Sequence, residues 1–282
     1  MESKRHVATK KSTIILLLPF IFWGVIFVIG PFAVLGWTSI SSKDIYGVID
    51  YQSFDLHAYQ SLLKPVFLGI FFKTFLFAGL CTLGCLLLGY PLAFFLSRLK
   101  GTLRSWALLG ILIPFWTSFL LRILAMFELF RNSDGSDGLL YTPFGVQIAM
   151  LYNYLPFAVL PLYASFTRIE TSCLEAARDL GATSFQIFLK VILPLSQRGI
   201  ATAVIFVFVP SLGEFLIPDL LGGGREFYLG TFLQNQFLSA RNWPLGSAMI
   251  CLLVFMSFVA IAFLKKATPT SASLFDDSGS AK

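Results

Sequence analysis

Long stretches without a charged side chain restrict this chain to one class of fold. Four stretches of at least 23 residues contain no Asp, Glu, Lys or Arg: Thr13–Trp37, Thr74–Ser97, Leu139–Thr167 and Asn242–Leu264. A transmembrane helix needs about 20 apolar residues to cross a hydrocarbon layer of about 30 Å. Charged residues make up only 13% of the chain, too few to cover the surface of a soluble domain of this size. The sequence therefore predicts a protein that crosses a membrane several times.

Two further stretches qualify despite isolated charges. Ser105–Leu121 is uncharged for 17 residues before this span meets Arg122 and Glu128, and Gly199–Leu221 carries only Glu214 and Asp219. With these two, we expect six transmembrane helices and an all-α membrane fold. No cleavage site of small residues closes the first stretch, which favours a permanent span over a signal peptide.

The distribution of basic residues indicates which side of the membrane each loop faces. If the N-terminus is cytoplasmic, 14 of the 21 Lys and Arg residues fall in segments on that side. Because cytoplasmic loops carry the excess of Lys and Arg, we expect both termini in the cytoplasm. The same distribution accounts for the net charge of +6 without a nucleic-acid partner. We expect residues 1–12 and 265–282 to be cytoplasmic tails and residues 13–264 to form the transmembrane domain.

The residues that catalysis inside a membrane requires are scarce. The two histidines, His6 and His57, lie outside the expected spans, and no Ser–Lys or paired-Asp motif stands on facing helices. No G-x-x-x-x-G-K-[ST] motif occurs, so we expect no ATP binding through a P-loop. Cys81 and Cys85 share a helix face without a neighbouring His or third Cys, which argues against a metal site. These absences argue against an intramembrane enzyme and leave a transporter subunit or an ATP-independent channel.

The longest expected cytoplasmic segment, residues 168–198, carries two helix-start signals. Ser172–Glu175 and Thr183–Gln186 both have the spacing of a capping box. Gly181 lies between them and suits the left-handed position that ends a helix. We expect a short helix, a glycine turn and a second short helix that Pro194 closes or kinks.

The same segment contains a family signature. Glu175–Ala177 is followed after three residues by Gly181, and Val191–Pro194 follows after nine more. This pattern resembles the EAA loop of ABC importer permeases of the type I fold, with Val191 where Ile is more usual. The resemblance implies a hairpin that couples the permease to an ATP-hydrolysing subunit. The residues to which this role carries over are Glu175, Ala176, Ala177 and Gly181.

Further stretches resemble the spermidine/putrescine branch of these permeases: Leu88–Arg98, Pro114–Arg122, Pro210–Gly223 and Arg241–Ala248. The resemblance implies a non-catalytic subunit of a polyamine importer in the bacterial cytoplasmic (inner) membrane, surrounded by membrane lipid. The implied partners are a homologous permease, two ATP-binding subunits and an extracytoplasmic substrate-binding protein. ATP and Mg would be held by the ATP-binding subunits, and this chain would hold no cofactor. Ferric iron, sulfate and other small solutes stay open as alternative substrates.

Four charged residues lie inside the expected spans, where insertion of each costs about 2.5–3.5 kcal/mol. Carboxylates suit a polyammonium ligand, so Asp219, Glu214 and Glu128 are candidate residues of the substrate path, with Asp219 as the leading one. Pro210 and Pro218 bracket Glu214 and predict a broken helix whose free carbonyl groups line a cavity.

Aromatic rings on neighbouring spans would add cation–π attraction for the same ligand. The candidate rings belong to Trp116, Tyr152 and Tyr154. Structural roles are the alternative for the charged residues. Arg122 would then neutralise Glu128 or Glu214 inside the bundle, and Asp219 would cap a helix or be solvated at the interface.

Overall fold

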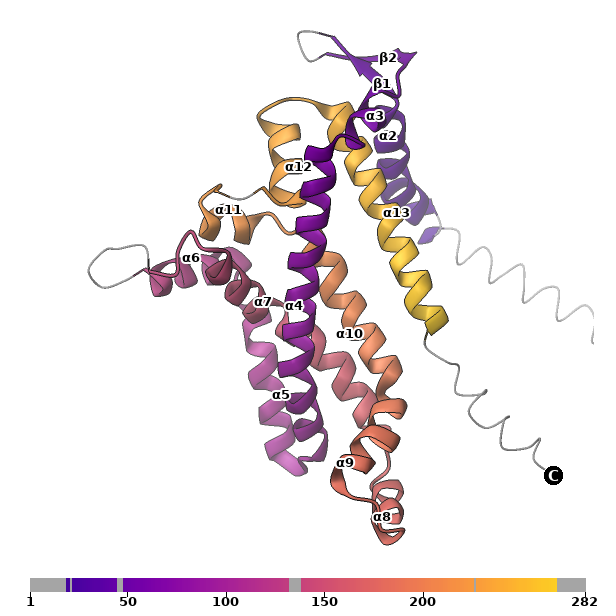
Figure 1. The fold of residues 1–282 in the computed structure, drawn as a ribbon, viewed down its shortest axis with the longest axis vertical. Coiled ribbons are helices and arrows are strands. Elements are labelled where there is room, and N and C mark those ends of the chain that lie inside the picture. The colour runs from indigo at the N-terminus through magenta and orange to yellow at the C-terminus, as the bar shows by residue number, and fades with distance from the viewer. Residues whose placement is uncertain (1–18, 21, 45–47, 132–137, 226, 268–282) are drawn as a thin grey trace, which may run out of the picture. The chain divides into compact units, whose positions relative to one another are not determined.

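The computed structural model describes residues 19–20, 22–44, 48–131, 138–225 and 227–267. Residues 1–12 and most of the expected tail 265–282 lie outside the described residues. The elements, shown in Figure 1, follow in the order η1 (Val25–Ile29), α2 (Gly30–Ser39), β1 (Ser41–Lys43), β2 (Ile49–Phe54), α3 (His57–Leu62), α4 (Pro65–Arg98), α5 (Gly101–Trp116), α6 (Phe119–Phe130), α7 (Pro143–Phe166), α8 (Thr171–Asp179), α9 (Ser184–Ile187), η2 (Phe188–Ile192), α10 (Leu193–Gly213), α11 (Leu216–Gly222), α12 (Leu229–Leu238) and α13 (Trp243–Ala267).

The described residues contain five helices long and apolar enough to cross a membrane, or six spans if α5 and α6 count as one bent span. The expected fourth stretch, Leu139–Thr167, corresponds closely to α7, because Thr142 caps the helix and Pro143 occupies its first turn. The all-α membrane fold is therefore confirmed.

The third span differs from the straight helix that its composition predicts. α5 and α6 meet at 93° because Thr117 and Ser118 have extended backbones (ψ 146° and 132°). The Thr117 hydroxyl donates to the carbonyl of Pro114 over 2.8 Å, which stabilises the chain where the helix stops. Glu128 therefore lies on the second arm of a bend rather than at the outer end of a straight span.

The fifth span also differs from the prediction. α9, η2 and α10 form one continuous run, Ser184–Gly213, so the second helix of the cytoplasmic hairpin is not short. Pro194 lies in the first turn of α10 and does not close the helix. Proline is tolerated at this position because the π-turn η2 (Phe188–Ile192) directly before it interrupts the i→i−4 hydrogen-bond pattern in which the missing N–H would take part.

A small antiparallel hairpin follows α2 and was not predicted. β1 pairs with β2 in the register Ser41↔Phe54, Ser42↔Asp50 and Lys43↔Ile49, with an irregularity between the first two pairs. β1 has only three residues, Ser-Ser-Lys, and none of them is apolar, so no alternation of apolar residues marks the first strand of this hairpin.

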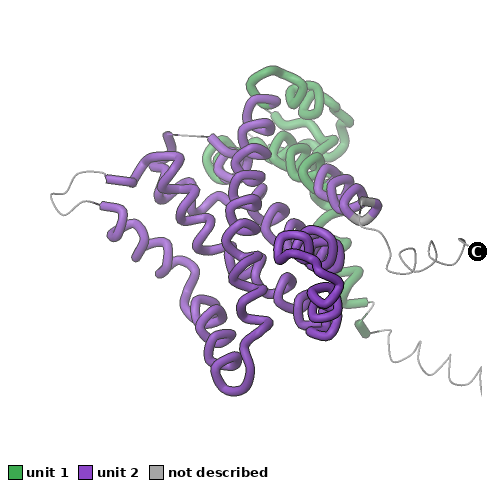
Figure 2. Tube along the Cα trace, turned by 60° about the horizontal axis from the view of Figure 1, so that its bottom comes forward, with its two compact units in different colours: residues 1–67, 235–254 green, residues 68–234, 255–282 purple. Residues whose placement is uncertain are grey.

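The chain forms two compact units, coloured separately in Figure 2: residues 1–67 with 235–254, and residues 68–234 with 255–282. In the second unit, α7 packs along α10, and α4 contacts both helices. The Tyr90 hydroxyl of α4 and the Ser196 hydroxyl of α10 lie 2.9 Å apart. In the first unit, the Ser39 hydroxyl at the end of α2 lies 2.9 Å from the Tyr59 hydroxyl of α3.

Candidate functional site

The fifth span ends at Glu214, where the helix breaks. α10 stops at Gly213, and Glu214 has an extended backbone (φ −65°, ψ 124°) before α11 begins at Leu216. Oε1 of Glu214 accepts hydrogen bonds from the backbone N–H groups of Leu216 (2.9 Å) and Ile217 (3.3 Å). The carboxylate thus satisfies two N–H groups that have no partner within α11.

Tyr154 of α7 engages the other oxygen of this carboxylate. The buried tyrosine hydroxyl donates to Oε2 of the half-buried Glu214 over 2.7 Å. The structure thus brings together two residues that the sequence assigned to the substrate path. A carboxylate has about four acceptor positions, so three internal hydrogen bonds leave one for a ligand.

The start of α12 covers the break from one side. A Cβ added to Gly230 would lie 2.4 Å from the carbonyl oxygen of Glu214 and 2.7 Å from that of Gly213. Such a close approach of two backbones requires glycine. Thr74 of α4 anchors this turn, because its hydroxyl accepts from the backbone N–H of Leu229 over 2.9 Å. The carbonyl groups freed by the break therefore face the backbone of α12, whereas the sequence predicted that they line a cavity.

Three other predicted path residues lie exposed. Asp219 is in the first turn of α11, where a negative charge is favoured by the helix dipole. Glu128 is exposed on α6, and Trp116 at the end of α5 is 80% exposed. α11 packs against both α6 and α7, so Asp219 belongs to the same group of helices as the Glu214–Tyr154 pair.

Tyr152 lies in a groove of about 280 Å³ on α6 and α7, which it shares with Arg122, Ala125, Met126 and Leu129. The Arg122 guanidinium lies 5.6 Å from the centre of the Phe119 ring, and its Nε is buried without a hydrogen-bond partner. Among the described residues Arg122 forms no ion pair with Glu128 or Glu214, so the neutralising role that the structural alternative gives it is not seen in this structure.

Asn153 is a buried polar residue of this region that the sequence analysis missed. It is 3% exposed, and its Nδ2 donates to the Ala149 carbonyl over 2.9 Å, while Oδ1 is buried without a partner. Asn153 carries no charge, so the positions of charged residues do not reveal it. An amide side chain inside an uncharged stretch is the sequence signal that indicates a buried polar residue of this kind.

The hairpin of residues 168–198 follows its predicted turn closely. Gly181 has φ +81°. The N–H of Ala182 donates to the Ala177 carbonyl (3.1 Å), and the N–H of Gly181 donates to the Arg178 carbonyl (2.8 Å). These two hydrogen bonds form a Schellman motif, which needs a left-handed residue after the helix.

Of the two predicted capping boxes, only one forms. Thr183 and Gln186 exchange hydrogen bonds between side chain and backbone in both directions. The first helix, α8, instead begins one residue early, at Thr171, and the Ser172 hydroxyl donates to the carboxylate of Glu170 over 3.1 Å. The Ser172–Glu175 capping box is therefore wrong.

The hairpin lies at the end of α10 away from α11 (Figure 1). Leu174 is buried against the helical core, whereas Glu175, Ala176 and Gly181 are exposed and Ala177 is half-buried. A groove of about 220 Å³ beside Glu175 is lined by Phe94, Arg98, Thr171, Leu174 and Arg178. The hairpin is thus anchored through several apolar residues, among them Ile169, Leu174 and Ile187, and it presents Glu175, Ala176 and Gly181 outward.

The architecture is that of an importer permease: a helical membrane protein with an exposed helical hairpin, turned at a glycine, before a broken fifth span. Residues 86–269 match the family described as binding-protein-dependent transport system inner membrane component. The chain belongs to this family and is an inner-membrane permease subunit.

Named relatives and solved structures agree with this assignment. The chain is 34% identical to the spermidine/putrescine transport system permease protein PotB of Escherichia coli (strain K12) over 256 residues, 86% of this chain and 92% of the relative. It is 34% identical to PotB of Haemophilus influenzae, with 86% and 90% covered. A bacterial alginate ABC transporter, solved in complex with a periplasmic protein bound to an alginate pentasaccharide, superposes with a TM-score of 0.73. That match has 17% identity and covers 92% of this chain and 94% of the other, so it shows the fold.

Proposed function

We propose that this chain is one permease subunit of an ATP-driven polyamine importer, paired with a homologous permease. The observation that carries the proposal is the 34% identity to spermidine/putrescine permeases over 86% of the chain. This similarity is too extensive to reflect the shared fold alone, since the alginate transporter reaches a TM-score of 0.73 with only 17% identity.

The hairpin supports coupling to two ATP-binding subunits, which bind ATP with Mg and hydrolyse it. Glu175 and Ala176 are exposed at the surface that such a subunit would contact. Gly181 fixes the turn behind them, and α9 continues into the fifth span without a break. A movement of the docked hairpin therefore reaches the interior of the membrane through one helix.

The acidic residues near the break support a cationic substrate. Removing water from an ammonium group is costly unless an acceptor replaces the water. Exposed Asp219 can accept the first ammonium group of a polyamine, and Glu214 retains one acceptor position beside the Tyr154 hydroxyl. These carboxylates would repel an anion such as sulfate.

Reconstitution in proteoliposomes tests the proposal. The full complex, with its binding protein and ATP inside the vesicles, should take up labelled spermidine or putrescine, and omission of the binding protein should abolish uptake. Sulfate and ferric iron should neither be transported nor compete. ATP-dependent uptake of sulfate or iron without polyamine uptake would overturn the substrate assignment.

A further inference from the structure

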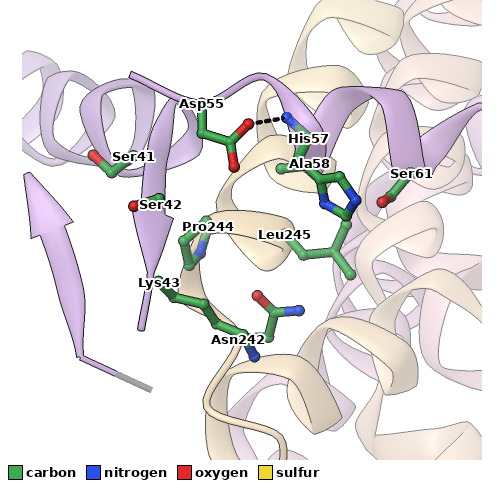
Figure 3. Close-up of a pocket in the computed structure, with 10 residues that line it drawn as sticks. All are labelled: Ser41, Ser42, Lys43, Asp55, His57, Ala58, Ser61, Asn242, Pro244 and Leu245. Atoms are coloured by element: carbon green, nitrogen blue, oxygen red, sulfur yellow. Dashed lines mark hydrogen bonds between the residues drawn. The ribbon is translucent and has the colours of Figure 1, made fainter. Parts of the chain in front are cut away.

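We propose that a polar pocket in the first unit binds the headgroup of a phospholipid that carries both an ammonium group and a phosphate. The pocket has a volume of about 280 Å³ and is formed by β1, the start of α3 and the start of α13 (Figure 3). Its lining includes Lys43, Asp55, His57 and Asn242 together with the apolar side chains of Ala58 and Leu245.

The pocket lies at the depth of the lipid headgroups. α2 ends at Ser39, so the pocket residues 41–43 come a few positions after this helix. α13 begins at Trp243, so the pocket residue Asn242 directly precedes it. Trp37 and Trp243 are 49% and 46% exposed at these two helix ends. Tryptophan is enriched at the membrane–water interface, which places the pocket beside it.

Two opposite charges line the pocket without meeting each other. Oδ1 of Asp55 accepts from the backbone N–H of His57 over 2.8 Å, and no described residue engages Oδ2. No hydrogen bond or ion pair with a described residue engages the Lys43 ammonium group. The backbone N–H of Asp55 donates to the carbonyl of Ile40 over 2.8 Å, which holds Asp55 beside the start of β1. Because Ile40 precedes Lys43 by three residues of extended chain, the backbones of Asp55 and Lys43 lie about 10 Å apart along the strand.

This separation suits a zwitterion. Figure 3 shows Asp55 and His57 on one side of the pocket and Lys43 with Asn242 on the other. The carboxylate can accept from a ligand ammonium group, while the lysine and the asparagine amide can donate to a phosphate. The hydroxyls of Ser41 and Ser42 already bond to Trp37 and Ser53, so they shape the wall.

Exposed apolar side chains beside the pocket favour a lipid over other occupants. Phe54, next to Asp55, is 74% exposed, and its ring packs edge-on against Trp37 at 5.7 Å. Acyl chains can cover such side chains at the interface. A polyamine would be repelled by Lys43, and a carboxylate of a docked protein would be repelled by Asp55.

Lipid retention by the assembled transporter tests this proposal. The purified complex is stripped with detergent and incubated with equal amounts of phosphatidylethanolamine, phosphatidylglycerol and phosphatidylcholine. After removal of free lipid, bound lipid is counted by native mass spectrometry. We expect the wild type to retain phosphatidylethanolamine at least fivefold over the other two, because phosphatidylglycerol lacks the ammonium group and phosphatidylcholine lacks its N–H donors.

Two variants separate the two ends of the pocket. Lys43→Met should lower retained phosphatidylethanolamine at least fivefold. Asp55→Asn keeps the oxygen that accepts from His57 and should lower retention to the level of phosphatidylglycerol. Lys64→Met, an exposed lysine outside the pocket, is the matched control and should match the wild type.

Equal retention of the three lipids by the wild type, or unchanged retention by Lys43→Met, would overturn the proposal. So would a Lys43→Met variant that weakens only docking of the binding protein, since the pocket would then be a protein contact. The assay contains neither ATP nor polyamine, so its result is independent of the proposed transport function.

Discussion

The hairpin at Gly181 and the broken end of the fifth span both consist of a helix, a short interruption and another helix, but different interactions hold them. At Gly181 an added Cβ would meet no atom within 4 Å, so the turn depends on the left-handed backbone alone. At the break, Gly230 approaches the Glu214 carbonyl so closely that an added Cβ would lie 2.4 Å away. The hairpin is therefore fixed by local hydrogen bonds, and the break is fixed by packing from residues distant in sequence.

This contrast predicts different consequences for adding a methyl group to each glycine. A change at the break should affect the folded state of the whole helical unit. A change at the hairpin should leave the membrane domain intact and affect only its communication with the ATP-binding subunits.

Gly230→Ala should have the largest effect. The new methyl group meets backbone atoms of Gly213 and Glu214, which cannot move without displacing α10, so we expect a loss of about 1–3 kcal/mol or more in stability. Thermal unfolding of the detergent-solubilised protein and polyamine uptake measure the loss, and uptake should fall below about one tenth. Gly79→Ala is the control, because its Cβ would meet nothing within 4 Å. Equal unfolding temperatures for the two variants would contradict the packing explanation.

Gly181→Val should reduce uptake about tenfold without reducing the amount of inserted protein. A β-branched residue resists positive φ, at a cost of about 1–2 kcal/mol, and the turn would shift to relieve it. Gly181→Asn is the matched control because asparagine tolerates the left-handed conformation. Uptake and substrate-stimulated ATP hydrolysis are measured in proteoliposomes. Normal uptake by the valine variant would show that the turn does not matter for coupling.

Asp219→Asn should reduce polyamine uptake severalfold, because it removes an exposed charge from the proposed path and preserves the side-chain shape. The affinity of the binding protein for polyamine and basal ATP hydrolysis should change little. Glu214→Gln keeps an oxygen that can accept from Leu216 and Ile217, so its effect on the fold should be small. Wild-type rates for both variants would remove the physical support for a carboxylate-lined path.

Tyr154→Phe should have the smallest effect on uptake, less than about twofold, and a measurable effect on stability. The hydroxyl bonds to a charged acceptor over 2.7 Å, and such hydrogen bonds contribute about 1.5–3 kcal/mol. A denaturant titration of the solubilised protein measures the difference. A Tyr154→Phe variant as stable as the wild type would contradict a stabilising role for this hydrogen bond.

The parts of this fold that the sequence predicted are those that neighbouring residues decide. The turn at Gly181, the Thr183–Gln186 capping box and the extent of α7 all follow from signals within a few positions. The 93° bend between α5 and α6 escaped prediction because Pro114 is tolerated inside α5 and the bend depends on Thr117 and Ser118, which are common in helices of membranes.

The site was predicted in its residue types but not in its contacts. Charge inside a span identified Glu214, and an aromatic ring identified Tyr154, yet nothing in the sequence pairs two residues 60 positions apart. Gly230 received no role because its requirement arises from the carbonyl groups of another segment. Asp219 and the coupling residues Glu175, Ala176, Ala177 and Gly181 stay predictions about function, since their roles depend on molecules that act from outside this chain.

The uninterrupted run Ser184–Gly213 has a mechanical consequence. Its 30 residues extend about 45 Å if regular, so it can act as a lever with the hairpin at one end and the break at the other. A tilt of about 5° would move the far end by about 4 Å, roughly the spacing of neighbouring residues along the chain. A rigid helix converts a small rotation at the hairpin into a displacement large enough to open or close a passage for a slender molecule. The π-turn η2 (Phe188–Ile192) lies near the hairpin end of this helix, so its resistance to bending would determine how much of the rotation reaches the break.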